Sequence, residues 1–175
     1  MAWDEWNDVD LNNKKILIVV GEHRPFTDRQ QKALDDFCEY HNAVVYVNHL
    51  SNYKGDYSIA ANLLVSCGGL SILKPDILIT VGGQTGDYSI YNALQTIGNV
   101  EHWRVSEDGA YVDTYGHLTR IFECPDYYFF EKLDNSKGSD HSYFNEWEQL
   151  ASTINYDVEL PFSNTYVAQQ LHNNI

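Results

Sequence analysis

Basic residues are scarce in this sequence of 175 residues. Only 11 Lys and Arg stand against 25 Asp and Glu, so the formal net charge is −14. Nucleic acids and anionic membranes are bound through Lys- and Arg-rich surfaces, so this charge argues against both as partners. Long apolar runs are also missing, since none approaches the ~20 residues of a membrane span. The acidic start, Met1–Trp6, lacks the basic and apolar regions of a signal peptide.

Cysteines and metal-ligand motifs are equally sparse. Cys38, Cys67 and Cys124 are widely spaced and form no CxxC pair, which favours neither a disulfide framework nor a zinc knuckle. A reduced, cytoplasmic compartment is therefore expected. The seven histidines are dispersed without an HxH or HExxH pair, so no metal site is predicted. Cys67 could serve as the nucleophile of a small hydrolase, but no activating base can be named, and a buried structural thiol is the preferred interpretation.

What the sequence does contain, between residues 14 and 124, is an alternation of short apolar runs with helical patterns. Such alternation predicts a mostly parallel sheet covered on both faces, that is, a doubly wound, Rossmann-like α/β fold with right-handed crossovers. The expected strands, which should be parallel neighbours, are Ile16–Val20, Ala43–Val47, Ile77–Val81, His102–Val105 and Thr119–Cys124.

Several helix starts and stops can be placed. Thr27 followed by Gln30 fits a capping box ahead of a helix that runs to about His41. The sequence Gly-Asp-Tyr-Ser-Ile occurs twice, at 55–59 and at 86–90. Because Asp is a good N-cap, both copies are predicted to begin helices, one over about 57–65 and one that Gly98 closes.

Beyond Pro125 the chain is rich in aromatic residues. A short helix is expected over Asp126–Leu133, carrying the rings of 127–130, and a loop over 134–139. A second helix, with Trp147, should end near residue 154, followed by a connector and a helical C-terminal extension at 163–171. We expect this aromatic tail to pack against flanking domains or a second subunit, because such rings are enriched at interfaces.

Two loops follow strands at the expected ligand-binding edge of the sheet. Parallel sheets bind ligands at the carboxyl ends of their strands. The second of these loops, residues 82–87, matches neither the G-x-G-x-x-G pattern nor a Walker loop, and its Asp87 would repel a phosphate. Simple polar turns are the preferred interpretation, with a free-standing nucleotide-binding module as the alternative. The candidate ligand-loop residues are Glu22, His23 and Arg24 in the first loop and Gly82, Gly83, Thr85 and Gly86 in the second.

One stretch is distinctive enough to carry a family resemblance. Residues 101–114, EHWRVSEDGAYVDT, followed by 118–124, LTRIFEC, resemble the end of the central domain of the thiamine-diphosphate-dependent 2-succinyl-5-enolpyruvyl-6-hydroxy-3-cyclohexene-1-carboxylate synthases (MenD) of menaquinone biosynthesis. Segments 15–21, 75–83 and 157–171 are similar to further parts of these enzymes, in matching order.

The resemblance implies three α/β domains in the intact enzyme, of which the outer two hold thiamine diphosphate and Mg²⁺. Both Gly-Asp-Tyr sequences carry Tyr where the cofactor motif of the family needs Gly. By resemblance this chain is the central domain at 14–154, with a connector or helix at 1–13 and a connector at 155–175 toward a missing cofactor-binding domain. No family catalytic residue can be placed here, so we expect an isolated chain that is inactive and binds no cofactor. Its expected partners are the flanking domains, in an enzyme that forms homo-oligomers.

Overall fold

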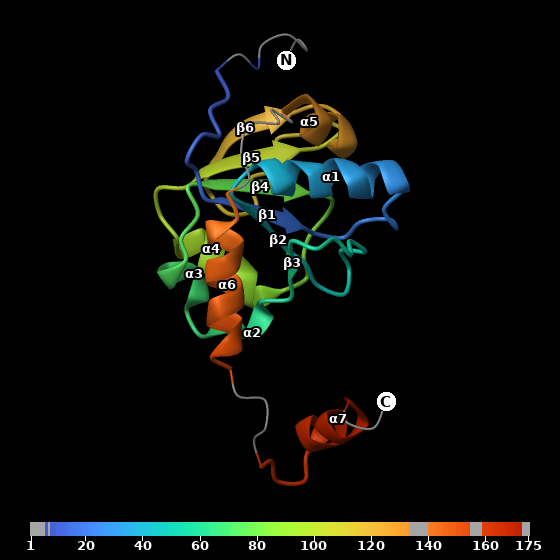
Figure 1. Cartoon of the computed structure of the whole chain (residues 1–175), viewed down its shortest axis with the longest axis vertical. Helices are drawn as coiled ribbons and strands as arrows, with labels where there is room; N and C mark the ends of the chain where they lie inside the picture. The colour runs from blue at the N-terminus through green and yellow to red at the C-terminus, as the bar shows by residue number, and fades with distance from the viewer. Residues whose placement is uncertain (1–5, 7, 134–139, 155–158, 173–175) are drawn as a thin grey trace.

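The structure is a computed structural model that describes residues 6, 8–133, 140–154 and 159–172. Its centre is a six-stranded sheet in the order β3-β2-β1-β4-β5-β6, and every neighbouring pair is parallel (Figure 1). The strands are β1 Ile16–Val20, β2 Ala43–Tyr46, β3 Ser58–Ile59, β4 Ile77–Val81, β5 Glu101–Val105 and β6 Leu118–Phe122. The helices are α1 Asp28–Tyr40, α2 Asn62–Ser66, α3 Gly69–Ile72, α4 Tyr88–Thr96, α5 Asp126–Leu133, α6 Ser142–Ser152 and α7 Asn164–His172.

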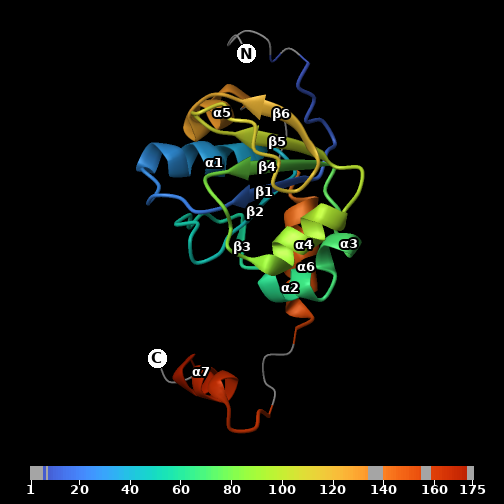
Figure 2. The same ribbon diagram turned by 180° about the vertical axis from the view of Figure 1, so that it is seen from behind.

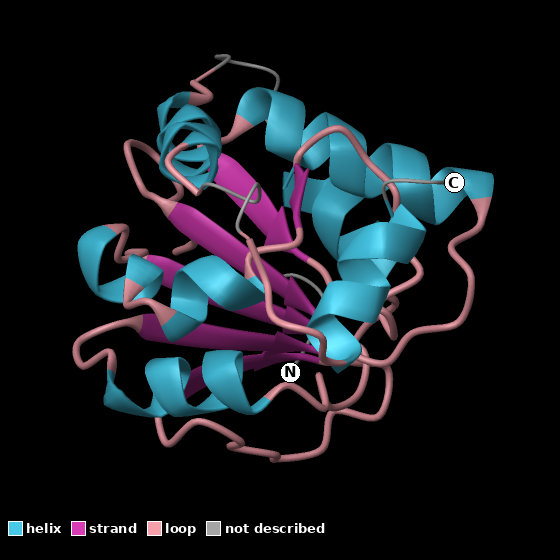
Figure 3. Cartoon of the chain, turned by 90° about the horizontal axis from the view of Figure 1, so that it is seen from below, coloured by secondary structure: helices cyan, strands magenta, loops and turns pink. Residues whose placement is uncertain are grey.

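The predicted doubly wound fold is confirmed, with helices on both faces of the sheet (Figures 2 and 3). Side chains alternate along a strand, so Ile16 and Ile18 face the core formed with α1 and α5, whereas Leu17 and Val19 face the core formed with α2, α3, α4 and α6. All five residues of β1 are buried. This two-sided burial explains why the strand appears in the sequence as an unbroken apolar run.

Three of the predicted helix boundaries are also confirmed. The Thr27 side chain accepts a hydrogen bond from the Gln30 amide, and the Gln30 side chain accepts one from the Thr27 amide, which completes the capping box of α1. Asp87 caps α4 by accepting from the Ser89 amide. Just beyond α4, Gly98 has a φ of 61°, the left-handed conformation that glycine adopts without strain at a helix C-terminus.

The helix predicted over 57–65 is wrong in its first half. Ser58 and Ile59 form the edge strand β3, and α2 begins only at Asn62. The reason lies in the amides on the open edge of β2: those of Val45 and Val47 donate to the carbonyls of Tyr57 and Ile59, at 2.9 and 3.0 Å. A helix starting at residue 57 would leave those donors unpaired, so the extended conformation overrides the capping signal of Asp56.

The prediction of an aromatic interaction surface after Pro125 is wrong for three of its rings and stays a prediction for the others. Phe129, Phe130 and Trp147 are at most 1% exposed, and the rings of Tyr127 and Tyr128 are half-buried against the same core. These helices cover parts of the sheet that would otherwise be bare. The Phe129 ring, for example, packs edge-on against Phe122 of β6 with 4.8 Å between centroids. Phe129, Phe130 and Trp147 therefore complete the domain, while Phe162, farther along the tail, is 89% exposed.

The ends of the chain differ in their relation to the sheet. Trp6 packs edge-on against Phe122, with 4.9 Å between ring centroids, while α7 lies apart from the sheet (Figures 1 and 2). The extension helix predicted at 163–171 is confirmed by α7. The loop predicted at 134–139 and the connector residues 155–158 lie outside the described residues. No helix of the described part of the chain is long and apolar enough to cross a membrane.

Candidate functional site

The two predicted ligand loops meet at the carboxyl edge of the sheet. They follow β1 and β4, which are neighbours in the sheet although 56 residues separate Gly21 from Ile77 along the chain. From β1 the chain continues to β2 on one side, and β4 lies on the other. This point, where the strand order reverses, is where open α/β sheets bind ligands. The predicted position of both loops, at the carboxyl ends of neighbouring parallel strands, is therefore confirmed.

Backbone hydrogen bonds close the crevice between the loops. The Glu22 amide donates to the Gln84 carbonyl at 3.0 Å, and the Gly83 amide donates to the Glu22 carbonyl at 2.8 Å. The chains approach so closely that a Cβ on Gly21 would lie 1.9 Å from the Gly83 oxygen. A bound phosphate needs free N–H groups at this point. The geometry thus gives no support to the nucleotide-binding alternative.

His23 is tied into the structure through both ring nitrogens. Its Nε2 lies 3.0 Å from an Asp126 carboxylate oxygen, and its Nδ1 lies 2.6 Å from the Arg24 carbonyl oxygen. The hydrogen bond to Asp126 raises the pKa of His23, against a smaller lowering by burial. The side chains of Glu22 and Arg24 are exposed. His23 therefore joins its loop to the start of α5.

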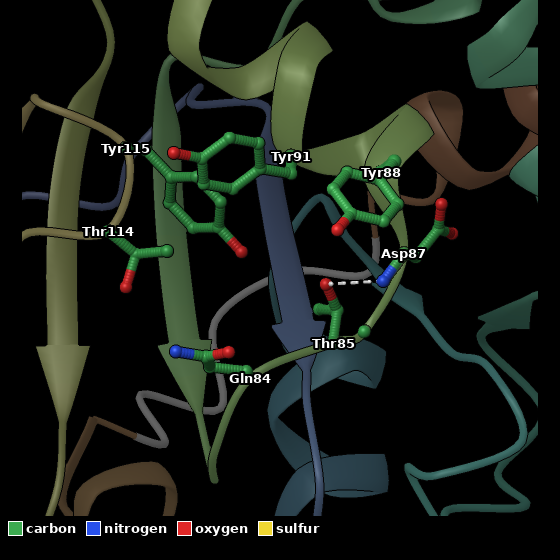
Figure 4. A pocket seen from close by; sticks show the side chains of 8 residues that line it. Gln84, Thr85, Asp87, Tyr88, Tyr91, Thr114 and Tyr115 are labelled. Carbon is green, nitrogen blue, oxygen red and sulfur yellow. Dashed lines mark hydrogen bonds between the residues drawn. The ribbon is translucent and has the colours of Figure 1, made fainter.

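A cavity of about 280 Å³ lies beside the closed crevice, between the start of α4 and the loop that joins β5 to β6 (Figure 4). Two predicted residues, Thr85 and Gly86, contribute to its wall. The full lining is Gln84, Thr85, Gly86, Asp87, Tyr88, Tyr91, Thr114 and Tyr115.

Asp87 organises the floor of this region. Its carboxylate accepts hydrogen bonds from the Tyr46 hydroxyl, from the Asn62 amide at 2.6 Å and from the Ser89 backbone N–H at 2.9 Å. Burial raises the pKa of Asp87, but these hydrogen bonds outweigh it and hold the pKa below its usual value. Burial raises the pKa of the Tyr115 phenol to about 12. At neutral pH the cavity therefore has the Asp87 carboxylate as an anionic group and a neutral Tyr115 phenol.

Several of these residues could not be found from the sequence. Tyr91 and Tyr115 meet with 6.1 Å between ring centroids although they come from different elements. Asp126 reaches His23 across 103 residues. The local signals were the place of Thr85 and Gly86 after a strand and the N-cap position of Asp87, which identified a helix start and not a cavity.

Cys67 is exposed, so the prediction of a buried thiol is wrong for this residue. It lies at the end of α2, where the chain turns toward α3, and lines a shallow apolar hollow. The other lining residues are Leu63, Leu64, Gly69, Ile72, Leu150, Thr153 and Ile154. None of them is a base that could activate a thiol, so the hydrolase interpretation has no support. The described residues contain no group of three or more His, Cys, Asp or Glu that could hold a metal ion.

The fold and the closed loops define a doubly wound α/β domain of the Rossmann-like class. No family model matches the chain. Among curated proteins, it is similar to the 2-succinyl-5-enolpyruvyl-6-hydroxy-3-cyclohexene-1-carboxylate synthase of Porphyromonas gingivalis, with 30% identity over 120 residues, which is 67% of this chain and 21% of the relative. The same-named synthase of Bacteroides thetaiotaomicron is 37% identical over 86 residues, 47% of this chain and 15% of the relative.

A third relative extends the similarity to nearly the whole chain. The synthase of that name from Flavobacterium psychrophilum is 28% identical over 171 residues, 91% of this chain and 30% of the relative. The resemblance noted in the sequence is thereby confirmed: the chain is a MenD-like domain. It spans less than a third of the length of each of these three relatives.

Proposed function

We propose that the chain is the non-catalytic central domain of a thiamine-diphosphate-dependent synthase of menaquinone biosynthesis. The intact enzyme decarboxylates 2-oxoglutarate and adds the resulting succinyl semialdehyde carbanion to isochorismate. In this proposal residues 14–154 form the domain, and 1–13 and 155–175 connect it to flanking domains that hold thiamine diphosphate and Mg²⁺. The intact enzyme is a cytoplasmic homo-oligomer.

The observation that carries the proposal is the extent of the similarity. The Flavobacterium psychrophilum synthase matches 91% of this chain, yet the matched part is only 30% of that synthase. A match that runs through almost all of one chain and through less than a third of the other is what one domain of a multidomain enzyme produces. The single parallel sheet with two cores supports the same unit.

The geometry at the carboxyl edge supports the non-catalytic part of the proposal. Mg²⁺ and a diphosphate require converging oxygen ligands and free amides. Here the Glu22 and Gly83 amides are used in backbone hydrogen bonds. The Asp87 carboxylate, in the Gly-Asp-Tyr sequence closest to a cofactor motif, already accepts from Tyr46, Asn62 and Ser89. These groups stabilise the fold and are not free to hold a cofactor.

Calorimetry tests the proposal. Titration of the purified chain with thiamine diphosphate and Mg²⁺ should give no saturable heat, while the Flavobacterium psychrophilum synthase under the same conditions serves as the positive control. Micromolar binding by the chain, or release of CO₂ from 2-oxoglutarate, would overturn it. Saturable binding of ATP or FAD instead, together with a native reading frame that ends near Ile175, would favour the free-standing nucleotide-binding module.

A further inference from the structure

The cavity beside the closed crevice is bordered by three aromatic rings. Tyr88 and Tyr91 come from the first turns of α4, and Tyr115 comes from the loop between β5 and β6. Tyr115 is 6% exposed and forms a fixed wall, whereas Tyr88 is 82% exposed and stands at the mouth. Figure 4 shows the hydroxyl ends of Tyr88, Tyr115 and Thr85 directed toward the same space. A ligand in this space would touch aromatic carbon and phenol oxygen.

The charges around the cavity select the sign of that ligand. Asp87 is the one charged residue among the eight that line it, and no Lys, Arg or His is among them. The hydrogen bonds that hold the pKa of Asp87 low keep its carboxylate ionised at neutral pH. The protein as a whole carries a formal charge of −14. Anions such as phosphates and carboxylates are therefore repelled, and cations are attracted.

Nearby basic side chains on β5 do not reverse this preference. His102 lies behind Tyr115, with 5.6 Å between ring centroids, and burial lowers its pKa to about 4, so it is neutral at pH 7. The guanidinium of Arg104 is paired with Asp108 at 2.9 Å and also donates to the Ala110 carbonyl at 3.1 Å. Its charge is thus already balanced by a carboxylate.

We propose that this cavity is a binding site for a small organic cation with a quaternary ammonium head group. Aromatic rings around one space attract a cation through their quadrupoles, and this arrangement suits quaternary ammonium groups. The carboxylate of Asp87 is occupied by three donors, so it attracts the cation through its charge and not through a further hydrogen bond. A quaternary ammonium has no N–H to donate, so the engagement of the Asp87 oxygens by other donors does not prevent its binding. The site is separate from the proposed synthase role and does not depend on it.

Choline and its neutral isostere 3,3-dimethylbutan-1-ol provide the test, because they share a shape and differ in charge. Both are titrated into the full chain and followed by NMR chemical shifts or calorimetry. Choline should bind saturably, and the alcohol should bind about tenfold more weakly, because it lacks the charge that the rings and the Asp87 carboxylate attract. No saturable choline binding, or equal affinity for the two compounds, would overturn the proposal.

Variants locate the site. Tyr88→Leu removes an exposed ring, so the fold should be kept, and choline affinity should fall about three- to tenfold. Tyr91→Phe keeps the aromatic ring and should bind choline with the affinity of the wild type. Tyr91→Leu removes the ring and should bind choline more weakly than the wild type. Tyr111→Leu is the matched control, since Tyr111 is 74% exposed but does not line the cavity. If Tyr88→Leu and Tyr91→Leu both bind choline like wild type, the cation binds elsewhere and the assignment fails.

Discussion

The imidazole of His23 and the carboxylate of Asp126 form an ion pair between segments 103 residues apart, with 3.0 Å between Nε2 and Oδ2. Both side chains are largely buried, at 14% and 10% exposure. The Gln30 amide, from α1, donates to the same carboxylate at 3.0 Å. One carboxylate thus joins the loop after β1, the first turn of α1 and the start of α5.

This pair should make stability depend on pH. The hydrogen bond to Asp126 raises the pKa of His23 above its ordinary 6.5, so its contribution is complete below pH 6.5 and is lost as the pH rises through the raised pKa. Burial raises the pKa of Asp126, but the hydrogen bonds from His23 and Gln30 outweigh this effect, so the pKa is lowered overall. The contribution of Asp126 is therefore lost only as the pH falls through that lowered pKa, below its ordinary 3.8.

Urea unfolding of His23→Gln checks this prediction. At pH 5.5, where both groups are charged, the variant should lose about 1–3 kcal/mol of unfolding free energy. At pH 9 the loss should be clearly smaller, because the folded histidine loses its charge as the pH rises through its raised pKa. His49→Gln, at an exposed histidine, is the control and should change little at either pH. A loss for His23→Gln that is the same at both values would contradict the pH-dependent role.

The two Gly-Asp-Tyr sequences offer a second prediction with a built-in control. Asp87 caps α4 and also holds Tyr46 and Asn62, whereas Asp56 is exposed and precedes a strand. Asp87→Ala should cost about 1–3 kcal/mol, because it removes a cap and leaves the hydroxyl of the buried Tyr46 without its acceptor. Asp56→Ala should stay within about 0.5 kcal/mol. Equal costs in thermal or urea unfolding would mean that the two sequences have the same structural role.

Local signals predicted much of the fold and little of the cavity. The predicted bounds of the strands Ile16–Val20 and Ile77–Val81 match those of the structure, because strands buried on both faces are continuous apolar runs. The edge strand Ser58–Ile59 has only two residues, and what fixes it is the open edge of β2, which no local pattern reveals. The Tyr91–Tyr115 contact and the His23–Asp126 pair likewise depend on how distant elements pack.

The buried rings of the aromatic tail were misjudged for a related reason, since aromatic density alone does not tell a core from an interface. Trp147 is 1% exposed in the core with α2, α3 and α4, so Trp147→Ala should cost about 3–5 kcal/mol through lost burial and a cavity. Phe162→Ala is the contrasting variant, because Phe162 is 89% exposed, and it should change stability by no more than about 0.5 kcal/mol. Chemical denaturation of both variants checks this, and a small cost for Trp147→Ala would contradict its role in this core.

The closed crevice gives the last prediction. A Cβ on Gly21 would lie 1.9 Å from the Gly83 carbonyl oxygen, a backbone atom that cannot swing aside. Gly21→Ala should therefore force the two loops apart, cost about 1–3 kcal/mol and weaken the hydrogen bond from the Glu22 amide to Gln84. Amide hydrogen exchange at Glu22 and Gly83 should become faster by at least about tenfold, which is the change expected when an opening step becomes about 1.4 kcal/mol easier. Gly98→Ala is the control. A Cβ on Gly98 would touch no other atom, but the φ of 61° is strained for alanine, so the substitution should cost about 1–2 kcal/mol. Hydrogen exchange at Glu22 and Gly83 should stay as in wild type. Unchanged exchange in Gly21→Ala would show that these backbone contacts do not keep the crevice shut.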